Sequence, residues 1–361
     1  MTAMLLLWML AADPTTRPEA IAKQAEAARD ADKVEAAIRL YRRGTTVSPK
    51  WAEGWWNQGT LLYDRNAFAE AGTALTKFAA LEPKAAPGWA LLGLCEFETH
   101  EYGLSLQHLE QGMRLGIPAG EPLAKVARYH AALVLTRGGQ FERALQLFAQ
   151  LAFQGAGDRD TIIATGIAGL RMAILPEQLP EAKRELAYET GHAIRESSAR
   201  REAEARGEFE TLIAKYPETP ELHDLLGRAL VTSEPDAALK EWLKELEVSP
   251  KHVPARLEIA FEYLKRGQAE AGLPYARQAA ELDPKQFAAH NALGQILLQT
   301  GDVAGGVKAL ETARRLAPKS PETRIALASA YAKAGRTADA ERERAEFIRL
   351  KAERDGADNS R

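Results

Sequence analysis

The stretch that decides the fold is PKQFAAHNALGQILLQTGDVAGGVKALETARRLAP, residues 284–318. It begins with Pro284 and ends with Pro318, which are 34 positions apart. Proline cannot continue the helix before it, because its ring removes a backbone N–H donor and fixes the backbone. Between the prolines, Gly294 and Gly306 flank the turn signal TGD at 300–302. The stretch therefore predicts two helices that a tight turn joins and that cross closely.

The same unit recurs along the chain. Prolines spaced 33, 34 or 35 residues apart occur in two runs, Pro49, Pro83 and Pro118, then Pro217, Pro250, Pro284 and Pro318. A first column of small residues comprises Ala25, Gly59, Gly93, Ala193, Gly227, Ala260, Gly294 and Ala328. A second column comprises Ala37, Ala71, Ser105, Ala205, Gly272, Gly306 and Ala340, with Ala238 joining after a deletion of one residue. A bulky residue such as Leu310 follows four positions later, on the same helical face, and is expected to fill the space between pairs.

This pattern is similar to the tetratricopeptide repeat, a 34-residue helix–turn–helix with the consensus W-x2-L-G-x2-Y…A-x3-F…P. GWALLGL at 88–94 carries Trp89, Leu92 and Gly93 in register. The resemblance implies an all-α protein, an α-solenoid with a right-handed superhelix of about nine helix pairs and one irregular insertion. The C-terminal repeats look like those of bacterial tetratricopeptide proteins of an uncharacterised subgroup.

We expect two blocks of repeats. The N-terminal block covers 18–156, with repeats near 18, 52, 86 and 125. The C-terminal block covers 186–354, with repeats near 186, 220, 253, 287 and 321. The charged end of the last repeat is expected to be a solvated cap, since no neighbour covers it. Residues 355–361 are expected to be a disordered tail.

The segment between the blocks, 157–185, breaks the period. Its first part reads as a helix without a second helix, and RMAILPEQLPEAKRE at 171–185 follows with Pro176 and Pro180. Fifteen helical residues span about 22 Å, and eight extended residues span about 25 Å. We therefore expect an extended strap that runs back along the orphan helix. Its apolar residues Ile174, Leu175 and Leu179 should cover the apolar stripe that the missing helix leaves open.

Composition excludes several classes of protein. The 361 residues carry a formal net charge of −3, which gives no attraction for nucleic acid or an anionic membrane. The single cysteine, Cys95, excludes an internal disulfide and a cysteine-based zinc site. It lies in an apolar helical run, so we expect a buried, unreactive thiol.

The first residues form an apolar run from Ala3 to Ala12. Ten residues cannot span a bilayer, which takes about 20, but they match the apolar region of a signal peptide cleaved after Ala11 or Ala12. No Lys or Arg precedes the run, so a first helix is the alternative. We expect a periplasmic or secreted protein, with a cytoplasmic location as the alternative.

No catalytic or cofactor motif is present. The chain lacks G-x-x-x-x-G-K-[ST], G-x-G-x-x-G and G-x-S-x-G. Glu189 and His192 form one E-x-x-H, whereas di-iron bundles need two such pairs and further glutamates. His290 takes the tryptophan position of its repeat, so packing explains it better than ligation. We predict no catalytic residue, no metal, no cofactor and no enzyme activity.

What remains is a surface, because the first helices of stacked pairs line a concave groove. The resemblance implies groove side chains at positions 2, 5, 9 and 12 of each repeat. In this chain the candidates are Glu53, Trp56, Thr60, Tyr63, Leu94, Phe97, Asp224, Arg228, Leu257, Phe261, Asn291, Gln295, Ile325 and Ser329. Trp56, Phe97 and Phe261 are equally well explained as core residues.

The Lys/Asn/Arg clamp by which chaperone-binding members of the family grip a C-terminal carboxylate does not transfer. The matching positions hold Trp56, Thr60, Ala90 and Leu94, so an apolar or extended segment is the expected ligand. We therefore predict a monomeric, non-catalytic scaffold that binds a protein or peptide segment in its groove, in a bacterial envelope. The alternatives are a cytoplasmic adaptor, or a regulatory subunit of an enzyme complex that recognises a small molecule or glycan.

Overall fold

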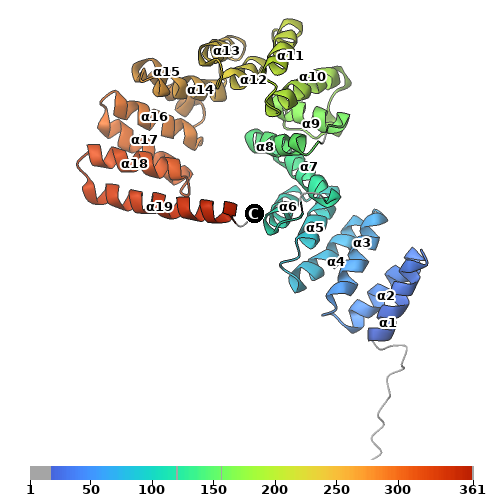
Figure 1. Cartoon of the computed structure of the whole chain (residues 1–361). Helices are drawn as coiled ribbons and strands as arrows, with labels where there is room; N and C mark the ends of the chain where they lie inside the picture. The colour runs from blue at the N-terminus through green and yellow to red at the C-terminus, as the bar shows by residue number, and fades with distance from the viewer. Residues whose placement is uncertain (1–17, 119–120, 156, 360–361) are drawn as a thin grey trace, which may run out of the picture. The chain divides into compact units, whose positions relative to one another are not determined.

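The computed structural model describes residues 18–118, 121–155 and 157–359, and within them every regular element is helical (Figure 1). The first helices of the pairs are α1 (Pro18–Asp30), α3 (Ala52–Asp64), α5 (Ala86–Glu98), α7 (Pro122–Arg137), α10 (Glu181–Ser198), α12 (Leu222–Leu230), α14 (Val253–Lys265), α16 (Phe287–Gln299) and α18 (Pro321–Lys333). The second helices are α2 (Val34–Val47), α4 (Phe68–Leu81), α6 (Tyr102–Leu115), α8 (Phe141–Phe153), α11 (Glu202–Lys215), α13 (Pro235–Val248), α15 (Ala269–Leu282), α17 (Val303–Leu316) and α19 (Thr337–Asn359). One further helix, α9 (Arg159–Gly169), and a 3₁₀ turn, η2 (Pro176–Gln178), lie between α8 and α10. The prediction of an all-α solenoid of helix pairs is confirmed.

The chain divides into two compact units. The first comprises residues 1–157 with 172–178, and the second comprises residues 158–171 with 179–361. The expected blocks 18–156 and 186–354 lie within the first and second units respectively. The segment between them is divided, because α9 belongs to the second unit and residues 172–178 to the first.

Within a pair, the two helices meet at the columns of small residues. A Cβ atom placed at Gly93 would lie 2.9 Å from the backbone nitrogen of Leu109 and 3.0 Å from the carbonyl oxygen of Ser105. A Cβ atom at Gly294 would lie 3.1 Å from the carbonyl oxygen of Gly306. Any larger side chain would push the backbones apart, so these positions fix how closely the helices pack.

Bulky residues fill the space beside these crossings. They are Tyr41, Leu75, Leu109, Phe148, Phe209, Trp242 and Leu310, each at most 2% exposed. Trp242 shows the arrangement, because its indole Nε1 would lie 2.5 Å from a Cβ atom at Gly227. The core is thus built pair by pair, as the sequence pattern predicts.

At five of the seven recurring prolines a hydrogen bond to the proline joins successive pairs. The exceptions are Pro118, which is followed six residues later by Ala124, and Pro217, where His223 contacts Glu241. A side chain six residues after the proline donates to the proline's carbonyl oxygen at 2.6–3.0 Å. The donors are Trp55 to Pro49, Trp89 to Pro83, Arg256 to Pro250, His290 to Pro284 and Arg324 to Pro318. The expectation that packing, not ligation, explains His290 is consistent with this contact.

In the irregular segment, α9 and α10 lie in direct contact. A Cβ atom at Gly166 would lie 1.7 Å from the carbonyl oxygen of Ala187, and one at Gly191 would lie 1.9 Å from that of Ile162. Near their N-terminal ends, Arg159 lies 3.4 Å from Glu185. Near their C-terminal ends, Gly169 and Ile194 are in contact. The two helices are therefore parallel, and residues 170–180 must return the chain along the length of α9.

This return segment is packed but not uniformly extended. Leu175 and Leu179 are buried, at 8% and 6% exposure, whereas Ile174 is half-buried. The expected extended strap is wrong at Pro176–Gln178, which forms η2. The reason is local: the side-chain Oε1 of Gln178 accepts the N–H of Leu175, and the N–H of Gln178 donates to the carbonyl of Leu175, both at 2.9 Å.

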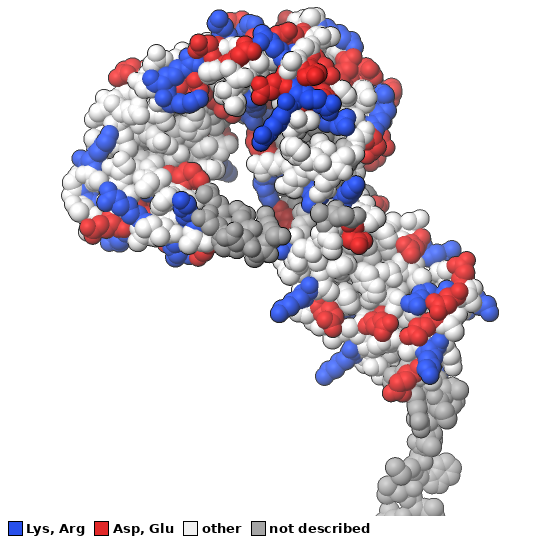
Figure 2. Space-filling view, in the orientation of Figure 1, with Lys and Arg blue, Asp and Glu red and all other residues white. Residues whose placement is uncertain are grey.

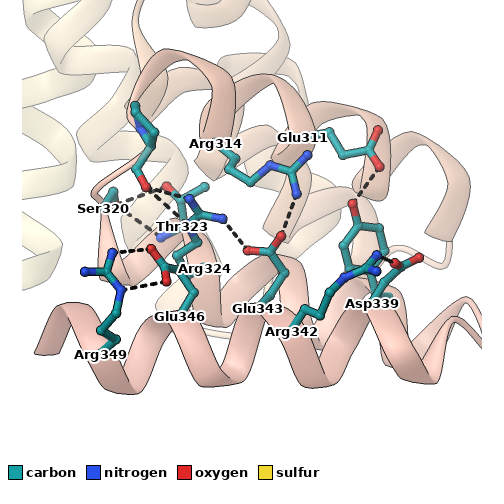
Figure 3. Close-up of polar contacts among 12 residues, drawn as sticks. Glu311, Arg314, Ser320, Thr323, Arg324, Asp339, Arg342, Glu343, Glu346 and Arg349 are labelled. Atoms are coloured by element: carbon teal, nitrogen blue, oxygen red, sulfur yellow. Dashed lines mark hydrogen bonds and ion pairs between the residues drawn. The ribbon is translucent and has the colours of Figure 1, made fainter.

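The last helix closes the array with polar contacts (Figure 3). Glu343 is only 5% exposed and accepts from Arg314 at 2.5 Å and from Arg324 at 2.7 Å. Ala340 and Leu350 are buried on the same helix, whereas Glu341, Arg342 and Arg344 are exposed. The helix continues to Asn359, so the expected disordered tail 355–361 is wrong for residues 355–359. Residues 360–361 and the expected signal peptide 1–12 lie outside the described residues.

We predict that Gly166→Ala and Gly191→Ala each lower the free energy of unfolding by about 2–3 kcal/mol, because an added methyl group would meet a backbone carbonyl. Gly207→Ala is the matched control, since a Cβ atom there has no atom within 4 Å. It should be neutral or stabilise by up to about 1 kcal/mol through helix propensity. Urea unfolding followed by circular dichroism measures all three. Equal effects at the three glycines would contradict the contact between α9 and α10.

We predict that Glu343→Ala lowers the free energy of unfolding by about 2–3 kcal/mol, because it leaves Arg324 and Arg314 without their shared carboxylate. Their side chains are 15% and 35% exposed, so water compensates only in part. Glu341→Ala on the same helix is the control and should change the free energy by no more than about 0.5 kcal/mol. Equal urea midpoints for Glu343→Ala and Glu341→Ala would show that the buried carboxylate of Glu343 does not stabilise the last helix.

Candidate functional site

Two adjoining hollows lie over the first helices of the first unit. The smaller, of about 350 Å³, is lined by Ala52, Glu53, Trp56, Phe78, Glu82, Ala85 and Pro87. The larger, of about 570 Å³, is lined by Trp56, Thr60, Tyr63, Asp64, Pro87, Leu91, Ile117, Pro118, Glu121 and Leu123. Because they share Trp56 and Pro87, we treat them as one surface and name it the N-terminal groove. Four of the sequence candidates, Glu53, Trp56, Thr60 and Tyr63, lie together there.

The two aromatic candidates are held from behind by other aromatic rings. Trp56 packs on Phe78 of α4 with ring centroids 5.1 Å apart, and Tyr63 meets Phe68 edge-on at 5.4 Å. Both are half-buried, so one side of each ring remains available in the groove. Burial raises the pKa of Tyr63, and its hydroxyl stays protonated at neutral pH. The groove thus offers rigid apolar walls with a polar tip.

A third hollow, of about 640 Å³, lies in the second unit. Phe261, Phe287, Ala288, Asn291, Gln295, Glu322, Ile325 and Ala326 line it, and we name it the C-terminal groove. Phe287 and Ile325 are 37% and 43% exposed, which is high for large apolar side chains. Four residues that the sequence analysis proposed for the groove come together here: Phe261, Asn291, Gln295 and Ile325.

Asn291 gives the C-terminal groove a polar centre. The residue is 6% exposed, and its Oδ1 is buried without a hydrogen-bond partner among the described residues. A buried, unpaired acceptor costs about 1–3 kcal/mol. Because the Oδ1 atom itself is buried, the side chain must turn for it to reach the groove, and an N–H donor placed there would then recover that energy.

The family profile described as tetratricopeptide repeat matches residues 22–86, 257–321 and 297–346. The chain carries tetratricopeptide repeats over those residues. No curated protein sequence is significantly similar to it.

Solved structures similar to this tetratricopeptide-repeat protein include MamA from Desulfovibrio magneticus RS-1, at 19% identity over 46% of this chain and 95% of that one, with a TM-score of 0.43. MamA AMB-1 matches at 21% identity over 46% and 98% of the two chains, with a TM-score of 0.41. MamA MSR-1 matches at 20% identity over 47% and 98%, with a TM-score of 0.39. At these identities and scores the likeness does not extend to function.

Several residues that the sequence analysis proposed as groove residues lie in neither groove. Leu94 and Asp224 are each only 2% exposed, so their prediction as groove residues is wrong. Leu94 packs among Ala90 and Leu109 in the core, and Asp224 accepts from Arg228 at 2.7 Å. Phe97 is held edge-on by Tyr102 and His130, as its core alternative implies.

Of the other candidates, Leu257 is buried at 8% and Ser329 is exposed, and neither lines a groove named above. Sequence reasoning also missed groove residues. Phe78 comes from a second helix, and Pro118 comes from the junction before α7. Repeat positions of the first helix alone could not find these two, although the recurring prolines mark the junction. Pro87 stands at position 2 of its repeat in α5, so the repeat pattern could have found it.

A buried polar cluster occurs at the start of α12. The backbone of Glu221 has a positive φ of 78°, and the carboxylate of Glu245 accepts its N–H at 2.9 Å. The donor atoms of Glu221, Asp224 and His252 lie within 4.8 Å of one another, which would suit a metal ion. However, His252 already uses both ring nitrogens, one with Glu221 at 2.8 Å and one with the N–H of Ala255 at 3.0 Å. These contacts explain the cluster as support for a strained helix start.

Burial raises the pKa of the Cys95 thiol to about 12, so the thiol is protonated at neutral pH. The expectation of an unreactive thiol is therefore supported.

None of the helices described here combines the length and the apolar character that crossing a membrane requires.

Proposed function

We propose that this tetratricopeptide-repeat protein is a non-catalytic scaffold that binds extended segments of partner proteins in its two grooves. The observation that carries the proposal is the gathering of half-exposed aromatic side chains on first helices, with Trp56 and Tyr63 in one groove and Phe261 and Phe287 in the other. Aromatic residues in partly open pockets are the usual anchors of protein interfaces.

The N-terminal groove favours a ligand with apolar anchors and flanking positive charge. Its walls are apolar, and the charged residues that line it, Glu53, Asp64, Glu82 and Glu121, are all acidic and exposed. No Lys or Arg lines either of its two hollows. An extended segment could place apolar side chains against Trp56 while basic neighbours approach the rim.

The C-terminal groove favours a main-chain contact. Its apolar side chains, Phe261, Phe287 and Ile325, surround the unpaired Oδ1 of Asn291. The backbone N–H of an extended segment is a donor of suitable size and direction, because alternate residues of such a segment present free N–H groups.

We predict that peptides selected from a random display library on the intact protein bind at least about tenfold more weakly to groove variants. Trp56→Ala with Tyr63→Ala tests the N-terminal groove, and Asn291→Leu tests the C-terminal one. Phe153→Ala and Ile348→Ala are matched controls, because these side chains are 69% and 65% exposed and line neither groove. Calorimetry with synthetic copies of the selected peptides gives the affinities. Peptides that bind both groove variants like the intact protein would refute the proposal.

We also propose that the protein acts in a bacterial envelope, supported only by the apolar run Ala3–Ala12. Mass spectrometry of the protein purified from its own host should then find a chain that begins at Ala12 or Asp13, with cleavage at the preceding alanine. A chain that retains Met1 would contradict export and favour a cytoplasmic adaptor.

A further inference from the structure

In the regular part of the array, the first helix of each pair packs against the second helix of the pair before it. The contact between α4 and α5 shows how. A Cβ atom at Gly88 of α5 would lie 2.5 Å from the ring of Phe78, and one at Gly72 of α4 would lie 3.9 Å from Leu92 of α5. Gly88 and Leu92 therefore mark the face of a first helix that receives the preceding second helix.

At α10 no such helix exists, because α9 has no second helix and the chain returns through residues 170–180. The small columns align Gly93 with Ala193, so Tyr188 and His192 of α10 take the places of Gly88 and Leu92. Both line an open hollow of about 630 Å³. We name this hollow, between α10 and α11, the vacant-helix site.

The face of α10 at the vacant-helix site is acidic, not apolar. Four carboxylates, two from each helix, converge on it. The lining residues are Glu185, Tyr188, Glu189 and His192 of α10 with Ala203, Glu204, Gly207, Glu208, Thr211 and Leu212 of α11. Figure 2 shows charged side chains gathered densely over the part of the second unit where α10 to α13 lie in Figure 1.

Groups of the chain reach three of these carboxylates. Arg159 lies 3.4 Å from Glu185, Lys215 lies 2.7 Å from Glu189, and a ring nitrogen of His192 lies 2.9 Å from Glu208. Glu185 and Glu204 are exposed, so the hollow retains acceptors for further cationic donors.

We propose that the vacant-helix site receives a lysine- or arginine-rich helix of a partner protein, which takes the place of the missing second helix. The shape indicates a helix, because elsewhere this face receives second helices of 14 residues. The charge indicates basic side chains and repels phosphate groups.

The lining suits the two parts of a basic side chain. Ala203 and Gly207 are small and exposed, which leaves room and apolar surface for a long side chain. Arg159 already stacks on the ring of Tyr188 in this way, 4.4 Å from its centroid. Lys and Arg cover such surface with their methylene stems while the charged head pairs with a carboxylate. This proposal does not depend on the grooves, which lie on other helices.

The test uses a fluorescein-labelled, lysine-rich amphipathic helical peptide as the probe, and a glutamate-substituted copy as its control. Fluorescence anisotropy should show binding of the lysine peptide to the full chain, and weaker binding as salt rises from about 50 to 300 mM. The glutamate copy should bind at least about tenfold more weakly.

Gly207→Trp fills the hollow and should weaken binding of the lysine peptide by about tenfold or more. Because a Cβ atom at Gly207 has no atom within 4 Å, the fold should persist, which circular dichroism checks. Gly103→Trp is the matched control and should bind like the wild type, because a Cβ atom at Gly103 of α6 also has no atom within 4 Å and Gly103 lies outside the vacant-helix site.

Three results would overturn the proposal. The wild type could fail to bind the lysine peptide, or Gly207→Trp could bind it unchanged. Alternatively, Trp56→Ala with Tyr63→Ala could abolish the binding, which would place the peptide in the N-terminal groove. The last result would leave the proposed scaffold function intact and refute only the vacant-helix site.

Discussion

The backbones of paired helices come into near contact at two columns of small residues, and the rest of the structure depends on this approach. Where the second column holds serine, a hydrogen bond accompanies the close contact, because the hydroxyl of Ser105 donates to the carbonyl oxygen of Gly93 at 2.8 Å. A crossing this tight fixes the direction of the second helix relative to the first. The bulky residues, the groove-lining first helices and the turns all take their places from that geometry.

The junctions between pairs follow a second constraint, which is chemical and not steric. Tryptophan, histidine and arginine differ in size and charge, yet Trp89, His290 and Arg324 each donate to the carbonyl of the proline six residues earlier. Where this bond forms, the position holds a long side chain with an N–H donor, whereas Ala124 takes the same position after Pro118. A histidine there is a structural residue, although histidine alone in a sequence invites a metal-binding interpretation.

Proline spacing and small columns were sufficient to predict every helix pair, because both report local rules of helix packing. Burial depth could not be predicted in the same way. Leu94 and Asp224 occupy groove positions of the repeat, yet both are buried by the pair that follows, Leu94 with Ala127 and Ala131 and Asp224 beside His252. The groove residue Phe78 comes from a second helix. Contacts between helices, which a single period does not encode, decided these cases. The 3₁₀ turn at Pro176–Gln178 depends instead on one local side-chain hydrogen bond.

The missing second helix has two consequences that share one cause. Without a helix between them, α9 and α10 approach until Gly166 and Gly191 meet the opposing backbone, and only glycine permits that distance. The same absence frees the other face of α10 from packing. The regular repeat that contains α5 has Gly88 and Leu92 at these positions, because the preceding helix α4 packs closely against them. At α10 these positions hold Tyr188 and His192 beside four glutamates, a composition that a buried helix contact would not tolerate without basic partners.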